Sequence, residues 1–257
     1  MATYNGSLYL KEQIDSVLSQ TIQDFELIVC DDCSSDDTWS ILEEYAKKDL
    51  RIRIYRNENN IGFIKNFEKG IYLSKGEYVA LCDQDDIWTE DHLEVLLDNI
   101  GDKMLSGGDA DIMDYEGRPI GLLLSETTGI TSFPSNDVER ALSFIFNQNL
   151  IQGASMLVRR DFLSVALPIP KNVKYHDEWF SLLACFYGGI CYTPRVINHY
   201  RKHGKNVSII PRISKNVYNH FKNRIKYDGI SYKELMLDEV EKRLNMSNTK
   251  KNIHMFL

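Results

Sequence analysis

The two common sequence motifs that hold phosphate groups are absent from this chain of 257 residues. No G-x-G-x-x-G motif follows an apolar segment, so the usual dinucleotide-binding loop is not expected. The sequence G-x-x-x-x-G-K followed by Ser or Thr does not occur either, which excludes a P-loop. A nucleotide bound to this protein would need other partners, such as carboxylates for the ribose and a metal for the diphosphate.

Long hydrophobic runs are also absent, and the cysteines follow no recognisable pattern. No segment approaches the roughly 18 apolar residues of a membrane span, so we expect no transmembrane helix. The cysteines are odd in number and irregularly spaced, which argues against a disulfide framework or a cysteine metal site. We expect reduced thiols in a cytoplasmic protein, and the alternative is a redox pair of Cys30 and Cys33.

Positive charge is in the minority, with 30 Lys and Arg against 37 Asp and Glu. This acidic balance argues against nonspecific binding to nucleic acid. Residues 201–226 are the exception, because they contain eight basic residues and no acidic one. A helix in this stretch could place Tyr218, Phe221 and Ile225 on one face and bind an anionic membrane peripherally. The alternative is an ordinary solvated helix.

Strand-like and helix-like segments alternate over residues 1–100. Such alternation favours an α/β fold with a mostly parallel sheet flanked by helices. After it, residues 101–135 show no clear periodicity, residues 137–196 form a second ordered block, and the chain from 211 onward is expected to be helical. The strand-like segments are 25–30, 52–55 and 78–82, and the helix-like segments are 7–20, 36–45 and 63–71.

Polar residues follow the ends of successive predicted strands: Thr3-Tyr4-Asn5, Asp31-Asp32 and Asp83-Gln84-Asp85-Asp86. In a parallel sheet these residues share one edge, which is where open α/β sheets bind ligands. The clustered acids repel one another unless a cation, hydrogen bonds or solvent offsets their charge. Mg²⁺ typically takes one or two carboxylates together with phosphate oxygens. The pattern therefore favours a metal-assisted nucleotide site over a solvated acidic turn.

Five short motifs occur in order within residues 2–88. They are Ala2-Thr3-Tyr4-Asn5-Gly6, Ser19-Gln20-Thr21 before Phe25-Glu26-Leu27, Asp31-Asp32-Cys33-Ser34-Ser35-Asp36, Asn60-Ile61-Gly62 and Cys82-Asp83-Gln84-Asp85-Asp86-Ile87-Trp88. In this order and spacing they resemble family 2 glycosyltransferases of the GT-A fold, especially bacterial rhamnosyltransferase-like members. The resemblance implies a GT-A domain over 1–210, with a nucleotide-binding part (1–100) and an acceptor part (101–210), followed by a helical tail (211–257).

The resemblance implies that the donor is a nucleotide-diphosphate sugar of the UDP or dTDP type. Tyr4, next to Thr3, would pack on the nucleobase, and Asp32 would hydrogen-bond to it with Asp31 as a close neighbour. The first acid of the D-x-D motif, Asp83, would bind the ribose. These residues form the implied nucleotide-binding set.

The same resemblance implies a divalent metal, Mn²⁺ or Mg²⁺, at the diphosphate. Asp85, the last acid of the D-x-D motif, would bind it, with His203 as a further candidate ligand. Arg201 and His203 lie in a segment that resembles the loop closing over the diphosphate. A cation there would stabilise the charge of the leaving group.

A sugar transfer that inverts the anomeric centre needs a base to take the proton of the acceptor hydroxyl. Asp177 matches the family's base position best, and Glu178 is the alternative. Both acids could instead simply favour the start of a helix, where negative charge is stabilised. Gly153 and Trp179 would lie on the acceptor side, facing a glycan or lipid-linked acceptor.

The leading prediction is an inverting, metal-assisted glycosyltransferase of cell-surface glycan synthesis, such as polysaccharide, O-antigen or capsule, that works in the cytoplasm or at the inner face of the membrane. One alternative is a non-catalytic nucleotide-sugar-binding homologue. Another is a nucleotidyltransferase, which usually has a glycine-rich basic loop that residues 1–20 lack. Compared with the family pattern, most of the apolar strand leading into Ala2 is missing, so we expect a shortened first strand and a natural start further upstream.

Overall fold

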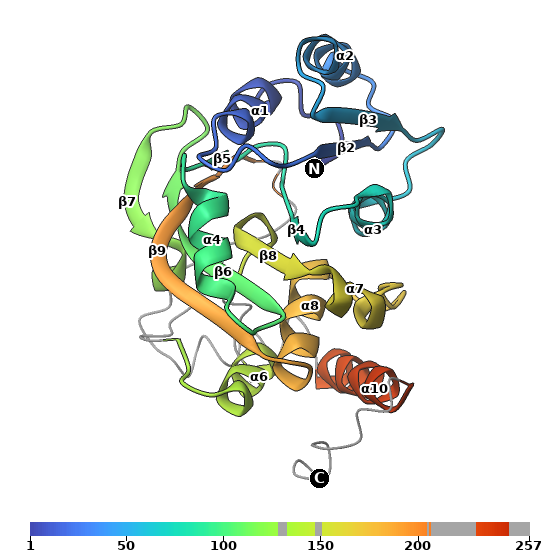
Figure 1. Cartoon of the computed structure of the whole chain (residues 1–257), viewed down its shortest axis with the longest axis vertical. Helices are drawn as coiled ribbons and strands as arrows, with labels where there is room; N and C mark the ends of the chain where they lie inside the picture. Colours follow the sequence, from blue (N-terminus) through green and yellow to red (C-terminus); the bar gives the residue numbers. More distant parts are fainter. Residues whose placement is uncertain (128–132, 147–150, 205, 207–229, 247–257) are drawn as a thin grey trace.

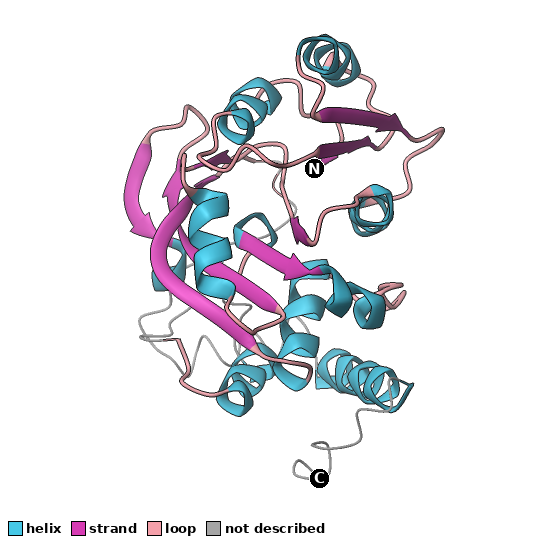
Figure 2. Cartoon of the chain, in the orientation of Figure 1, coloured by secondary structure: helices cyan, strands magenta, loops and turns pink. Residues whose placement is uncertain are grey.

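The computed structural model describes residues 1–127, 133–146, 151–204, 206 and 230–246, which form two sheets with helices around them (Figures 1 and 2). The first sheet has the order β1-β2-β3, and both of its strand pairs are parallel. Its elements confirm the predicted alternation of strands and helices. They are β1 (Ala2–Thr3), α1 (Leu10–Leu18), β2 (Leu27–Asp31), α2 (Thr38–Lys48), β3 (Ile52–Arg56) and α3 (Phe63–Leu73).

The second sheet is mixed, with the order β4-β8-β6-β9-β5 and with β7 paired to β6. Strands β6 and β9 run parallel, whereas the other assigned pairs run antiparallel. Strands β4 and β5, from the predicted nucleotide-binding part, therefore share a sheet with strands of the predicted acceptor part. The strands are β4 (Tyr78–Ala80), β5 (Ile87–Trp88), β6 (Leu105–Met113), β7 (Pro119–Leu123), β8 (Met156–Arg159) and β9 (Ile190–Arg201).

Strand β6 is long and central, although its sequence showed no strand periodicity. Gly107 and Gly108 interrupt its apolar pattern for a steric reason. A Cβ atom on Gly107 would lie 2.5 Å from Cγ2 of Ile151, and one on Gly108 would lie 2.6 Å from Cδ1 of Ile197. The space beside this strand is already filled by side chains from other segments.

The remaining helices cover the second sheet and extend the fold at the end opposite the first sheet (Figure 1). They are α4 (His92–Ile100), α5 (Leu124–Thr127), α6 (Asp137–Phe146), α7 (Arg160–Ala166), α8 (His176–Phe186) and α10 (Ile230–Met246), with a 3₁₀ turn at Gly153–Ser155. Within the described part of the chain, none of these helices is both long and apolar enough to cross a membrane. Residues 207–226, most of the predicted membrane-binding stretch, lie outside the described residues.

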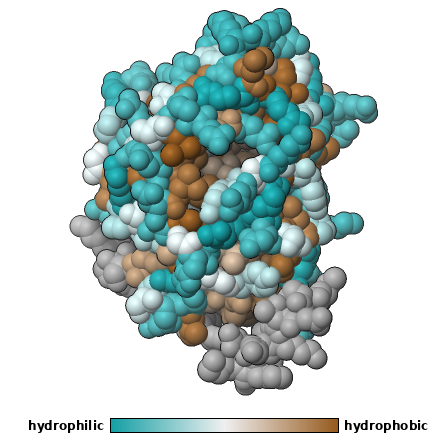
Figure 3. Space-filling model, viewed as in Figure 1, coloured by the Kyte–Doolittle hydropathy of each residue, from teal (hydrophilic) through white to brown (hydrophobic). Residues whose placement is uncertain are grey.

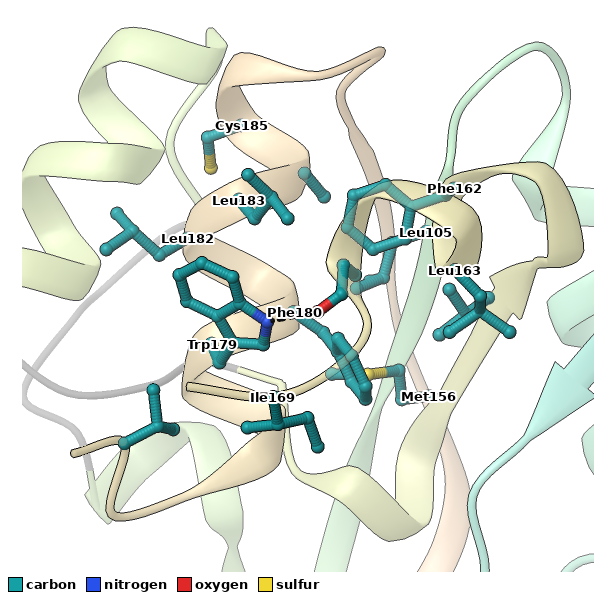
Figure 4. Close-up of a cluster of buried hydrophobic side chains, with 14 of the residues drawn as sticks. Leu105, Met156, Phe162, Leu163, Ile169, Trp179, Phe180, Leu182, Leu183 and Cys185 are labelled. Carbon is teal, nitrogen blue, oxygen red and sulfur yellow. Dashed lines mark hydrogen bonds between the residues drawn. The ribbon is translucent and has the colours of Figure 1, made fainter. Parts of the chain in front are cut away.

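Helix α8 runs through the larger hydrophobic core, and nine of its 11 residues are buried. Figure 4 shows Trp179, Leu182 and Leu183 of this helix packed with side chains of α7, β6 and β8. Each large apolar side chain buried in this way contributes roughly 1.5–3 kcal/mol. The core therefore fixes the direction of α8 and the position of its first turn.

A groove with a cavity volume of about 740 Å³ separates β2 from β4. Figure 3 shows hydrophobic side chains gathered around a hollow near the middle of the face in view. Strand β1 enters one end of this groove, where Cys30 N donates to Met1 O (3.0 Å) and Ala2 N donates to Cys82 O (3.3 Å). β1 therefore links the two sheets at this end, and beyond Met1 the edges of β2 and β4 face the groove.

An apolar, β-branched peptide of about four residues fused directly before Met1 should extend β1 through this groove. Each buried apolar side chain adds roughly 1.5–3 kcal/mol, so we expect a melting temperature several degrees higher than that of the unextended chain. A Ser/Gly extension of equal length is the control. Equal melting temperatures for the two extensions would show that the groove does not accept a strand.

Two of the histidines that the structure describes are buried in the cores of the fold. His92 stacks on Trp88 with 3.9 Å between ring centroids, and its Nδ1 lies 2.8 Å from Ile197 O. His176 packs against Phe67 with 4.2 Å between ring centroids. Burial lowers the pKa of each imidazole to about 3, so both are neutral in the folded protein at neutral pH.

Each of these histidines makes a contribution to the free energy of unfolding that decreases in mild acid. Each has a lowered pKa when folded and titrates near 6.5 when unfolded, so its stabilising effect is complete above pH 6.5 and is lost as pH falls toward 3. Each histidine should cost about 1.4 kcal/mol per pH unit below pH 6. Urea unfolding at pH 6.5 and 5.0 should give a smaller pH dependence for His92→Gln than for the wild type. An unchanged pH dependence would contradict the assignment.

Candidate functional site

The acids that follow β4 meet Asp177 at the start of α8. Burial, followed by the nearby carboxylates of Asp85 and Asp177, raises the pKa of Asp83 to about 7. Asp177 lies about 90 residues further along the chain, so only the tertiary fold can bring these groups together. The structure thus brings Asp83 and Asp85, which were predicted to bind the ribose and the metal, near the predicted base in one negatively charged site.

Asp85 faces a histidine at the end of β9. His203 Nε2 lies 2.8 Å from Asp85 Oδ2, and both side chains are mostly shielded from solvent. Among the residues that the structure describes, no three His, Cys, Asp or Glu side chains are arranged to hold a metal by themselves. One carboxylate and one imidazole nevertheless fit a divalent metal whose remaining ligands are phosphate oxygens and water.

Asp86, for which the sequence suggested no role, joins the acidic turn to β9. It is buried, and its carboxylate accepts hydrogen bonds from Arg201 N and from Asn198 Nδ2, both at 3.0 Å. Burial and the neighbouring carboxylates of Asp85 and Asp83 raise its pKa well above the usual range. Asp86 therefore holds the turn in place rather than facing a ligand.

Arg201 does not face the diphosphate position as expected. Its side chain is only 2% exposed, and its guanidinium packs over the ring of Tyr9, 4.6 Å from the centroid. Its Nε donates to Asp85 O (3.0 Å), and Nη2 pairs with Glu12 of α1. These contacts correct the prediction. Arg201 supports the backbone of the acidic turn through the carbonyl of Asp85, whereas His203 contacts the Asp85 carboxylate.

Thr3 and Asp31 are also buried, which corrects their predicted contact with the nucleotide. Thr3 Oγ1 donates to Asp31 Oδ1 (3.1 Å), and Ser34 N donates to Asp31 Oδ2 (3.0 Å). The Arg56 guanidinium lies 3.5 Å from the same carboxylate, which is 0% exposed. This network ties the ends of β1 and β2 together and leaves Asp31 no solvent-facing surface.

Asp32 anchors the loop before α3. Its Oδ1 accepts from Ile61 N and Asn57 Nδ2, both at 2.8 Å, and its Oδ2 accepts from Gly62 N at 2.9 Å. Gly62 has a φ of 85°, a conformation that favours glycine. Asp32 is itself only 2% exposed, but a carboxylate oxygen can accept two hydrogen bonds, so Oδ2 keeps the capacity for one more donor.

Tyr4 is 48% exposed, and a clamp that the sequence reading missed fixes its backbone. Tyr4 N donates to Gln84 Oε1 (2.8 Å), and Gln84 Nε2 donates to Tyr4 O (3.1 Å). The end of β1 and the acidic turn are therefore adjacent, in agreement with a shared edge. The one available signal was the position of Gln84 inside the D-x-D motif, which gives no indication of its partner.

Asp177 and Glu178 differ in their surroundings. Asp177 Oδ1 accepts from Glu178 N (2.8 Å) and Oδ2 accepts from Gly153 N (3.2 Å). Glu178 is 4% exposed, and its Oε2 accepts from the hydroxyl of Tyr232 (3.2 Å). Asp177 is thus the acid on the side of the acidic turn, with the Gly153 amide beside it, whereas Glu178 belongs to the interior.

Trp179 does not reach an acceptor. It is fully buried in the core shown in Figure 4, and its Nε1 donates to Ala166 O (2.9 Å). The predicted acceptor contact of Trp179 is therefore wrong, because this fourth residue of α8 faces the core. Gly153 does lie at the site, next to Asp177, where its amide rather than a side chain is available.

Comparison with known proteins agrees with this geometry. The model of glycosyl transferase family 2 matches residues 1–164. An uncharacterized glycosyltransferase of Haemophilus influenzae is 31% identical over 246 residues, which cover 90% of this chain and 72% of that protein. TuaG of Bacillus subtilis, a protein named for teichuronic acid biosynthesis, is 33% identical over 131 residues, about half of each chain (50% and 52%).

A solved structure has the same fold. Residues 1–349 of S. aureus TarS, crystallised with UDP-GlcNAc, superpose with a TM-score of 0.61 at 19% identity and cover 97% of this chain and 72% of that one. At this identity the likeness shows the fold alone, a GT-A-type α/β arrangement. Because the family model matches well over half of its length, this chain belongs to glycosyl transferase family 2.

Proposed function

We propose that this protein is an inverting glycosyltransferase that moves a sugar from a UDP- or dTDP-type donor to a cell-surface glycan or lipid-linked acceptor. The observation that carries the proposal is the meeting of Asp83, Asp85 and Asp177 in one site. TarS was crystallised with UDP-GlcNAc, and the name of TuaG refers to teichuronic acid biosynthesis, which supports this choice of donor and acceptor classes.

The donor would bind along the edge formed by β1, the acidic turn and the loop before α3. The exposed ring of Tyr4 offers a surface for the nucleobase, and Asp32 Oδ2 can accept one hydrogen bond from it. Asp83 would accept hydrogen bonds from the ribose. Asp85 and His203 would hold a divalent metal, Mn²⁺ or Mg²⁺, which would supply positive charge to the leaving diphosphate.

Asp177 would act as the general base. As the acceptor oxygen bonds to the anomeric carbon, the bond to the diphosphate breaks and the hydroxyl proton passes to the Asp177 carboxylate. The amides of Gly153 and Glu178 orient that carboxylate, so it does not have to reorganise during the reaction. Glu178 is the weaker candidate because it is buried and bonded to Tyr232.

Asp177→Asn should lower sugar transfer by at least about 100-fold, because an amide cannot take the proton. The thermal shift produced by UDP with Mn²⁺ should remain. Asp161→Asn is the matched control, since Asp161 also accepts from the next amide at a helix start (Phe162 N, 2.9 Å) but lies on α7. A screen of UDP, dTDP and GDP sugars supplies the donor. Nucleotide binding without turnover by the wild type would instead identify a non-catalytic homologue.

Removing the imidazole of His203 should weaken nucleotide binding only when metal is present. We expect His203→Gln to raise the Kd of UDP in Mn²⁺ by about tenfold or more and to leave the Kd in EDTA unchanged. The control is His199→Gln, because His199 of β9 forms a similar pair with Asp111 of β6 (2.6 Å). Equal effects of the two variants in calorimetry would contradict a metal site at Asp85 and His203.

A further inference from the structure

Helix α10 lies beyond the residues matched by the family model and packs against α7 and α8. In Figure 1 it lies beside these helices, at the end of the molecule opposite the first sheet. Four of its residues recur at helical spacing and join the larger core: Tyr232, Met236, Val240 and Leu244. The first of these residues also reaches the segment that carries Asp177.

The hydroxyl of Tyr232 uses both of its hydrogen-bonding roles on that segment. It donates to Glu178 Oε2 (3.2 Å) and accepts from Lys174 N (3.0 Å). The Lys174 ammonium also lies over the Tyr232 ring, 4.5 Å from its centroid. A single buried hydroxyl therefore bonds to two residues that flank Asp177, one on each side.

The direction of the Asp177 carboxylate depends on this segment. Asp177 Oδ1 is held by the amide of Glu178, the residue whose side chain Tyr232 contacts. A shift of the first turn of α8 would change the distance between Asp177 and Gly153 N as well. Small displacements of a catalytic group lower the rate steeply because the reacting atoms must approach closely.

We propose that Tyr232 is a positioning residue that acts through Glu178 and the backbone of Lys174 to fix the direction of Asp177. This inference rests on the proposed function, in which Asp177 is the base. It assigns to α10 a part in the site, although the helix contributes no group to the reaction itself.

If Tyr232 only held α10 in place, then any change that loosens α10 would lower activity in the same way. Arg243 of the same helix provides a matched control for this alternative. Near the other end of α10, Arg243 donates to the carbonyls of Val165 (3.0 Å), Leu167 (2.6 Å) and Pro168. These contacts attach the helix to the end of α7 and to the loop that follows it, and none of them is made to Lys174, Asp177 or Glu178. Arg243→Gln should therefore loosen the helix without changing the direction of the base.

Tyr232→Phe removes the hydroxyl and keeps the ring. We expect kcat, measured well below the melting temperature, to fall by about tenfold, the factor that corresponds to the loss of one hydrogen bond to a charged group. The KM for the donor and the UDP thermal shift should stay unchanged. Arg243→Gln should lower the melting temperature and leave kcat unchanged. Adding Glu178→Gln to Tyr232→Phe should give no further loss, because the hydrogen bond to a charged acceptor that Glu178→Gln weakens is already absent in Tyr232→Phe.

An unchanged kcat in Tyr232→Phe, an equal loss in Arg243→Gln, or additive losses in the double variant would overturn the inference. Amide hydrogen exchange over residues 173–180 provides a readout that needs no activity. It should accelerate in Tyr232→Phe but not in Arg243→Gln, and equal exchange would also overturn the inference. Full transfer by Asp177→Asn would instead refute the proposed function. In that case amide hydrogen exchange over residues 173–180 would be the remaining test of whether Tyr232 fixes the segment around Asp177.

Discussion

Negative charge gathered at one edge of the fold is the constraint on which the rest of the site depends. Three acids follow β4 within four residues, and the fold adds Asp177 to them from a different segment. Carboxylates this close repel one another unless each has a compensating partner. The partners come mainly from the end of β9: the Arg201 amide for Asp86 and the His203 imidazole for Asp85. The antiparallel pairing of β5 with β9, which sets Ile87 opposite His199, therefore also places these partners beside the acidic turn.

The carboxylates at the ends of β1 and β2 in the first sheet also need compensating partners. Asp31 is paired with hydroxyls, an amide and the Arg56 guanidinium, and Asp32 with the amides of the loop before α3. Both acids are buried, but they have different tasks: Asp31 supports the strand ends, whereas Oδ2 of Asp32 keeps one acceptor position. Buried, fully bonded groups of this kind make a site rigid, and they confine direct contacts with a ligand to fewer residues.

The sequence predicted the alternating elements of the first 100 residues because their apolar residues follow helix and strand periods. It predicted the acidic turn and Asp177 from motifs that lie at strand and helix ends. It could not predict which polar groups face outward, because burial depends on partners that are distant along the chain. Arg201 resembled a phosphate-binding cation until Glu12 and Tyr9 were seen to enclose it. Likewise the sequence did not predict β6 as a strand, because glycines interrupt its apolar pattern. Ile151 and Ile197 occupy the space that side chains at Gly107 and Gly108 would need.

The choice between Asp177 and Glu178 shows how the core shapes the chemistry. Successive residues of an α-helix point about 100° apart, so two adjacent acids at a helix start cannot both face the same site. Trp179 and Phe180 are fully buried and fix the rotation of α8 about its axis. That rotation turns Glu178 toward Tyr232 and leaves Asp177 beside Gly153 and the acidic turn. The proposed base is therefore selected by the apolar residues that follow it, and a change of packing under α8 would alter the site without touching any of its polar groups.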